Sequence, residues 1–122
     1  MANRAKQKGT SFETAVVNWL AIHGIAARRL PLAGNKDQGD IEVLHWGINI
    51  EAKNCKALAL SQWVAESDVE SGNSGKPVVV VAKRVGKGDP GEAYVIMPLR
   101  RLVELLPGPQ SGQSDQSGTL AQ

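Results

Sequence analysis

Residues 39–53 have the sequence Gly-Asp-Ile-Glu-Val-Leu-His-Trp-Gly-Ile-Asn-Ile-Glu-Ala-Lys, and this stretch decides the fold. Apolar and polar residues alternate on both sides of the Trp46-Gly47 dipeptide, a pattern typical of two short strands joined by a tight turn. Glu51 and Lys53 share one face of the second strand, because side chains alternate along a strand. A hairpin turning near Trp46-Gly47 brings Asp40 beside them. The stretch therefore predicts a site where two carboxylates and an ammonium meet.

Composition limits what such a site can belong to. With 122 residues, 42% of them hydrophobic, the chain can bury one modest core and is expected to be a single domain. The formal net charge of +2 is too small to predict a nucleic-acid partner by itself. Cys55 is the sole cysteine, which excludes an intramolecular disulfide and a multi-cysteine metal site and favours a reduced compartment. No signal peptide or membrane-spanning run is found, so we expect a protein that is cytoplasmic, or nuclear if the source has a nucleus, without a membrane partner.

The two ends of the chain differ in composition from the middle. Residues 1–9 are polar and basic and end in a glycine, which predicts a flexible basic arm. From residue 107 onward the sequence is mostly Gly, Ser, Gln and Pro, so 107–122 is predicted to be a disordered tail. Residues 10–106 are expected to form the folded domain.

Within 10–106, hydrophobic periodicity predicts alternating helices and strands. An apolar stripe with helical spacing runs through residues 12–20, and Thr10 followed by Glu13 is a capping-box pattern that predicts the helix start at Thr10. The apolar run 78–82 predicts a strand buried on both faces. The expected order is helix 10–23, strand 25–30, the hairpin, helix 61–70, strand 78–82, strand 93–97 and a helix opened by Pro98. This is an α/β fold: one domain with a central mixed β-sheet flanked by helices, in the order α-β-β-β-α-β-β-α.

The predicted acids need a charge partner. Two carboxylates near one point repel each other, Lys53 offsets part of that repulsion, and a hard divalent cation bound by both would remove it. Oxygen ligands favour Mg²⁺ or Mn²⁺ over zinc, which prefers histidine and cysteine. Because Mg²⁺ also accepts phosphate oxygens, the predicted substrate is a phosphodiester, with the metal lowering the pKa of the attacking water. Lys53 would orient that water or stabilise the transition state.

These residues resemble a known family. The triplet Glu51-Ala52-Lys53, with Gly39-Asp40 before it and Glu13 on an N-terminal helix, is similar to the motifs of the PD-(D/E)XK nuclease superfamily. The chain looks most like the archaeal and phage Holliday junction resolvases, over roughly residues 8–97. Gly39 stands where the superfamily's name has a proline. The resemblance implies a restriction endonuclease-like core and a metal-dependent, structure-specific DNA endonuclease of recombination and repair, in a bacterial, archaeal or phage-infected cell.

The resemblance also implies roles for individual residues. Asp40 and Glu51 would be metal ligands, joined by the backbone carbonyl of Ala52, while Lys53 would be the catalytic lysine and Glu13 an accessory acid. A further polar residue, at the start of the following helix, matches a position that often faces the site; this is Gln62. The candidate contacts with DNA are basic residues of the arm, loops and strand ends: Lys8, Arg28, Arg29, Lys36 and Lys83.

Resolution of a four-way junction by two symmetric cuts implies branched DNA and a second copy of the chain as partners. The terminal apolar helix or Trp46 would supply the contact of a homodimer.

Other interpretations of the same residues stay open. Glu13 is also explained as a helix cap, Asp40 as a turn residue before a strand, and Glu51 with Lys53 as an exposed charge pair. A related endonuclease acting on flaps or duplex DNA, or a non-catalytic nucleic-acid-binding module with the same fold, would share these motifs. A small structural protein would show no dependence on metal.

Overall fold

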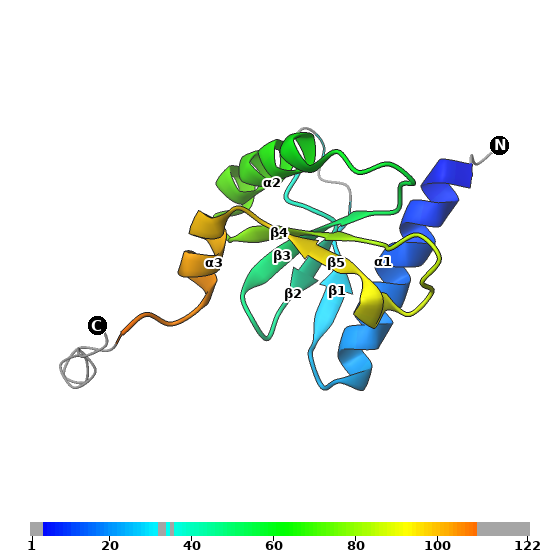
Figure 1. The fold of residues 1–122 in the computed structure, drawn as a ribbon. Helices are drawn as coiled ribbons and strands as arrows, with labels where there is room; N and C mark the ends of the chain where they lie inside the picture. Colours follow the sequence, from blue (N-terminus) through cyan, green and yellow to red (C-terminus); the bar gives the residue numbers. More distant parts are fainter. Residues whose placement is uncertain (1–3, 32–33, 35, 110–122) are drawn as a thin grey trace.

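The computed structural model describes residues 4–31, 34 and 36–109. Three α-helices, a short 3₁₀ helix and five strands form one α/β domain (Figure 1). In chain order the elements are α1 (Arg4–Ile22), β1 (Ala27–Arg29), β2 (Ile41–Val43), β3 (Ile48–Lys53), α2 (Leu60–Ser74), β4 (Val78–Ala82), η1 (Pro90–Glu92), β5 (Tyr94–Ile96) and α3 (Leu99–Leu105). The predicted tail lies outside the described residues from 110 onward. In the part of the chain that is described, no helix combines the length and apolar character needed to cross a membrane.

The strands form a single mixed sheet in the order β1-β2-β3-β4-β5. Neighbouring strands are antiparallel except β3 and β4, which run parallel and are connected through α2. A parallel pair needs such a crossover, because the chain must return to the end of the sheet at which it started. The α/β class and the mixed sheet predicted from the sequence are thereby confirmed.

The hairpin has the predicted register. Ile41 pairs with Ile50 and Val43 with Ile48. The turn closes with a 2.9 Å hydrogen bond from the Gly47 N–H to the Val43 carbonyl, and Gly47 has φ +66°, in the left-handed region where glycine is favoured. Asp40, the residue before β2, therefore lies directly opposite Glu51, the residue after Ile50.

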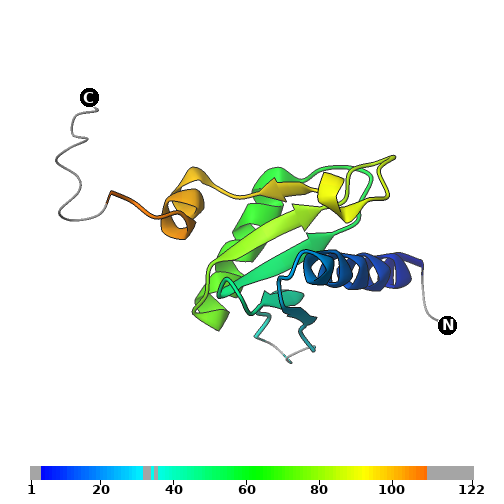
Figure 2. The same cartoon turned by 90° about the horizontal axis from the view of Figure 1, so that it is seen from below.

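Two cores lie on opposite faces of the sheet. On one face α1 buries Phe12, Val16 and Leu20 against β2, β3 and β4, and on the other face α2 packs Trp63 against β4. Figures 1 and 2 show β3 and β4 between these two helices. All five residues of β4 are buried, as predicted for residues 78–82. Each face of β3 therefore meets a different helix.

The start of α1 corrects a prediction. The helix begins at Arg4 rather than Thr10, so residues 4–9 are helical and do not form a flexible arm ahead of it. Thr10 and Glu13 lie inside the helix, where backbone N–H groups already bond to carbonyls one turn earlier, so the capping-box interpretation of Glu13 is wrong. The predicted end is correct, since α1 stops at Ile22 and Gly24 follows with φ +78°.

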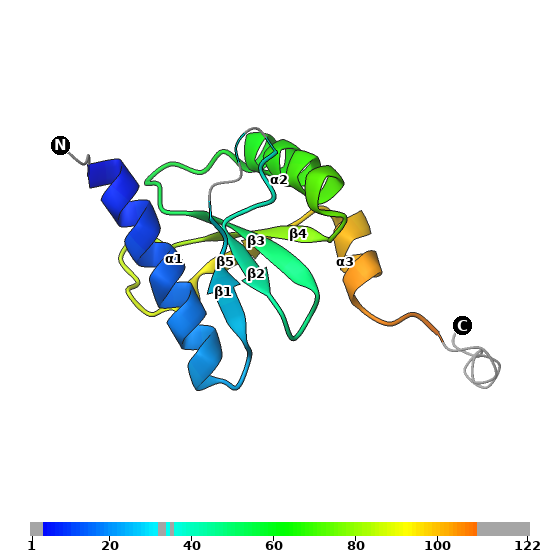
Figure 3. The ribbon, with the colours of Figure 1, turned by 180° about the vertical axis from the view of Figure 1, so that it is seen from behind.

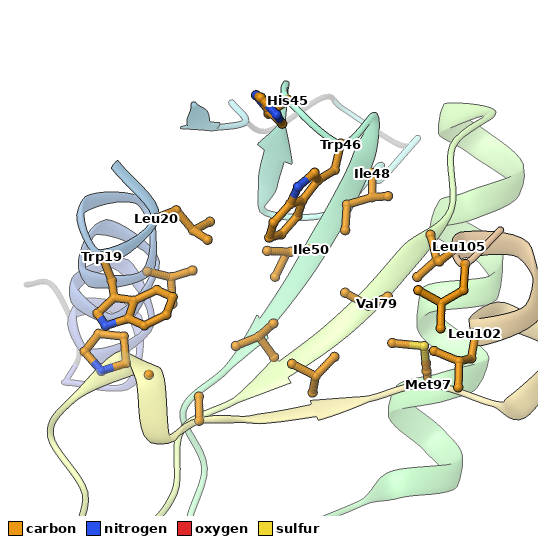
Figure 4. A pocket seen from close by; sticks show the side chains of 17 residues that line it. Trp19, Leu20, His45, Trp46, Ile48, Ile50, Val79, Met97, Leu102 and Leu105 are labelled. Carbon is orange, nitrogen blue, oxygen red and sulfur yellow. The ribbon is translucent and has the colours of Figure 1, made fainter. Parts of the chain in front are cut away.

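The α1 face of the sheet is only partly covered. Helices α1 and α3 lie at opposite ends of the sheet (Figure 3), and between them opens an apolar pocket with a volume of about 740 Å³. Figure 4 shows side chains of α1, the hairpin, β4 and α3 pointing into it. The large hydrophobic residues around it that keep the largest exposed fractions are Trp46 at 52%, Val95 at 59% and Leu106 at 57%.

Candidate functional site

The polar side chains of β3 point toward α2. Ile50 belongs to the α1 core, so the residues on either side of it face the opposite way, and Glu51 is 9% exposed beneath α2. The ammonium Nζ of Lys53 lies 3.2 Å from Glu51 Oε2 and 2.8 Å from Oε1 of Glu66 on α2. The structure thus brings Glu51 and Lys53 together as predicted, and Glu66 joins them.

Asp40 is fixed at the same end of the hairpin. Its N–H donates to the Ile50 carbonyl at 2.8 Å, and its Oδ2 accepts the N–H of Ala52 at 2.8 Å. The residue before it, Gly39, has φ +106°, and a Cβ there would lie 3.2 Å from the Ile50 carbonyl oxygen. A proline, whose φ is held near −65°, could not take this conformation. Glycine at 39 therefore lets the chain pass close to β3 and place the Asp40 carboxylate beside Ala52.

Burial and neighbouring charge disfavour ionisation of Asp40. Burial, followed by the negative charge of Glu51, raises the pKa of Asp40 to about 7, while the hydrogen bond from Ala52 acts in the opposite direction. The charge of Glu13 on α1 contributes to the same rise, which places Glu13 within electrostatic reach of the site. Glu13 also forms a 3.1 Å ion pair with Arg29.

A second group of acids meets at Glu51. Carboxylate oxygens of Asp37, Glu51 and Glu70 all lie within 4.8 Å of one another, and we call these residues the acidic triad. Asp37 comes from the loop before β2, and Glu70 from α2, where it is 3% exposed. Burial, together with Glu51, raises the pKa of Glu70 to about 10, so this carboxyl holds a proton at neutral pH in the metal-free protein.

Sequence reasoning did not identify Asp37, Glu66 or Glu70. A signal for Glu70 was present, because Trp63, Ser67 and Glu70 recur at helical spacing and are the residues that α2 buries. A glutamate on the buried stripe of a helix is unusual and would have marked α2 as part of the site.

Several buried oxygens in this region lack a donor. Apart from the proton that Glu70 itself carries, no hydrogen-bond donor among the described residues reaches Oε1 of Glu51, Oε1 of Glu70 or Oδ1 of Asn49. Buried polar atoms normally have a hydrogen-bond partner. A bound cation takes that role for a group of buried acceptors that lack donors. The donor set contains oxygen atoms only, which suits a hard divalent ion. The acidic triad could therefore hold a metal ion.

The other predicted site residues are placed less directly. Gln62 reaches the site through Glu66, whose Oε2 accepts its amide N–H at 3.2 Å. The backbone N–H of Lys83 donates to the Lys53 carbonyl at 2.9 Å, and Lys36 is exposed on the loop before Asp37. Arg28 is exposed but paired with Glu42 at 2.8 Å. The side chain of Lys8 lies outside the described residues.

Comparison with models of known protein families gave no match, and comparison with curated proteins gave none either.

Proposed function

We propose that the protein is a metal-dependent DNA endonuclease of the PD-(D/E)XK type, which cuts four-way junctions by paired symmetric incisions. One observation carries the proposal: Asp40, Glu51 and Lys53 meet at the end of one hairpin, with Asp40 bonded to the backbone of the residue between the other two. The strand order, with α2 crossing between parallel β3 and β4, is compatible with a restriction endonuclease-like core and supports the same reading.

In this proposal Asp40 and Glu51 hold the cation with the backbone carbonyl of Ala52. The carbonyl of a strand residue points to the same side as its N–H, and the N–H of Ala52 points to Asp40. A bound Mg²⁺ or Mn²⁺ would supply charge neutralisation at the phosphate and a lower pKa for the attacking water. The buried oxygens without donors fit an ion with oxygen ligands.

Lys53 acts as a fixed positive charge. Burial lowers the pKa of Lys53, but the hydrogen bond to Glu66 and the charge of Glu51 outweigh burial and raise it above its usual value. The side chain therefore stays protonated and cannot accept a proton from water at neutral pH. Its role is to stabilise the negative charge that develops on the phosphate, and Glu66 positions it for that role.

In this proposal two lysines would contact the DNA backbone. Lys83 follows β4, with its backbone bonded to that of Lys53, and the exposed Lys36 precedes Asp37 in the loop before β2. Neither forms an ion pair with any residue in 4–31, 34 or 36–109, so their charges are available for phosphate. Arg28 and Arg29 are each paired with a glutamate and would contact DNA only by exchanging that partner.

Paired cuts require two active sites, and we assign the partner as a second copy bound at the apolar pocket. The pocket lies on the α1 face, away from Glu51 and Lys53, so a partner there leaves both active sites open. Its exposed rim includes Trp46, which the sequence offered, with the terminal apolar helix, as a candidate for the interface.

Cleavage of labelled DNA tests the proposal. A four-way junction, a flap and a linear duplex are each incubated with the protein, with Mg²⁺ or with chelator. We expect paired symmetric nicks in the junction that need Mg²⁺, and Lys53→Ala should lower their rate by about 10²–10³-fold. Asp40→Asn should abolish them. Glu92→Gln, an exposed carboxylate paired with Arg84 outside the site, is the matched control and should cleave like the wild type.

The outcomes separate the alternatives. Cutting of flaps or duplex in preference to the junction would keep the endonuclease and replace its substrate. Binding of DNA with no metal-dependent cleavage of any substrate would contradict the endonuclease and favour a non-catalytic binding module.

A further inference from the structure

We propose that Tyr94 is a base-stacking site, which takes an unpaired nucleobase of the DNA strand whose phosphate is bound at Lys53. The inference rests on the endonuclease proposed above and deepens it, because it names the feature of the substrate that the protein would select. Tyr94 is the only tyrosine in the sequence, and it begins β5, the last strand in the order of the sheet.

The register of the sheet places Tyr94 in one row with Lys53. Ala82 of β4 pairs with Lys53 on one side and with Tyr94 on the other. Residues paired across neighbouring strands point to the same face of a sheet, and both Lys53 and Ala82 contact α2. Tyr94 therefore lies on the face of the proposed active site, two strand spacings or about 10 Å from Lys53. Trp63 packs against Ala82 between them.

The two aromatic residues of this row differ in burial. Trp63 is 5% exposed and belongs to the core under α2, whereas Tyr94 is 45% exposed. The strand β5 begins toward α1, beyond the first turn of α2 (Figures 1 and 3), so the helix leaves its first residue uncovered. An exposed aromatic ring beside a phosphate-binding site is the feature on which proteins stack nucleobases.

The guanidinium of Arg84 holds the ring of Tyr94 in place. Its central carbon lies 5.3 Å from the ring centroid, and Glu92 fixes the guanidinium through a 3.0 Å ion pair. A cation over one face of the ring leaves the other face for a base. A ring that is already positioned also loses less conformational entropy when a base stacks on it.

Positive charge surrounds the same end of the sheet. Lys56 follows β3, and Lys83 and Lys87 follow β4; the two loops leave the sheet side by side because these strands are parallel (Figure 1). Lys56 and Lys87 are exposed. Proteins that bind unpaired strands combine such charges, which follow the phosphates, with aromatic rings, which take the bases. A duplex keeps its bases stacked on one another, whereas a branch point can release one, so Tyr94 would select branched DNA.

Affinity for labelled DNA, measured by fluorescence anisotropy in the presence of chelator, tests the inference without relying on cleavage. Tyr94→Leu removes the ring from an exposed position and should weaken binding of a four-way junction by about 5–100-fold, with binding of a linear duplex unchanged. Tyr94→Phe keeps the ring, is the matched control and should bind both DNAs like the wild type. Glu92→Gln keeps an oxygen acceptor for Arg84 and should do the same.

A second measurement reports the stacking itself. Junctions carrying 2-aminopurine, a fluorescent base that stacking quenches, at successive nucleotides of the branch point are saturated with each protein. At one of these positions the wild type and Tyr94→Phe should quench the label, and Tyr94→Leu should not.

The outcomes separate this inference from the proposed function. Equal junction binding and equal quenching by the wild type and Tyr94→Leu would overturn the stacking site, and the endonuclease would stand if the wild type still cuts. Equal weakening of junction and duplex binding by Tyr94→Leu would also overturn the stacking site. Ring-dependent binding without metal-dependent cleavage of any DNA would keep the stacking site and contradict the endonuclease. A wild type that binds neither DNA would overturn both.

Discussion

The two faces of β3 have different contacts and different proposed roles, although they share one backbone. On the α1 face, Ile48 and Ile50 pack into an apolar core, and on the α2 face Glu51 and Lys53 meet acids from α2 and from the loop before β2. Burial of side chains on the apolar face stabilises the folded chain. On the acidic face, buried carboxylates raise one another's pKa. Stability and the proposed chemistry are therefore separated by a single residue along the strand.

The comparison predicts that damage to the α1 face lowers stability and spares ion binding. Leu20 of α1 is 6% exposed and packs on the sheet at the edge of the apolar pocket. Leu20→Ala should lower the free energy of unfolding by about 2–5 kcal/mol, measured by urea denaturation, because it removes buried methylene groups and leaves a cavity. The number of Mn²⁺ ions bound per folded chain should not change. A loss of ions at undiminished stability would contradict the separation of the two faces.

A substitution on the α2 face should change the free energy of unfolding in the opposite direction. Glu70 has a pKa of about 10 in the folded chain against an ordinary value of 4.5, so between these values the unfolded chain releases a proton that the folded chain keeps. The metal-free wild type should therefore lose stability as the pH rises from about 5 to 8. Glu70→Gln removes this cost and should raise the free energy of unfolding at pH 7 by about 1–3 kcal/mol, with a flatter pH profile.

Glu66→Gln is the control for that measurement. The hydrogen bond from Lys53 lowers the pKa of Glu66, so its carboxylate is favoured in the folded state. Its removal should leave stability unchanged or slightly lower it, because the side chain is partly exposed and its ion pair is screened. Equal stabilisation by both substitutions would show that general relief of negative charge, and not burial of Glu70, is responsible.

The sequence predicted the elements whose pattern is local. Alternation fixed the hairpin and its register, and the apolar run of β4 marked a strand buried on both faces. Asp40, Glu51 and Lys53 were found together because register and period alone determine their positions. The first turns of α1 were missed because residues 4–9 carry no apolar stripe, and helix there is an extension of a helix anchored further along.

The triad depends on tertiary structure and was not predictable in the same way. Asp37 and Glu70 are separated in the sequence by the hairpin and most of α2. They meet because β4 runs parallel to β3, which sets the connecting helix α2 over the polar face. Helical period could place Glu70 on the buried side of α2, but no local pattern states which strand that side covers. The sequence predicted α2, the helix that supplies the new ligands, but it did not predict the position of that helix over Glu51.

The smallest effect is expected at the exposed edge of the apolar face. Trp46 is 52% exposed in the single chain, so Trp46→Ser should change the monomer's free energy of unfolding by no more than about 0.5 kcal/mol. If the second copy sits on the pocket, the same substitution should shift sedimentation equilibrium from dimer toward monomer, since exposed aromatic residues contribute strongly to interfaces. Junction cutting should then become two uncoordinated nicks while Mn²⁺ binding stays at the wild-type level. A dimer unaffected by Trp46→Ser and by Leu106→Ser would remove the pocket from the interface, and with it the idea that the apolar face has a role beyond the core.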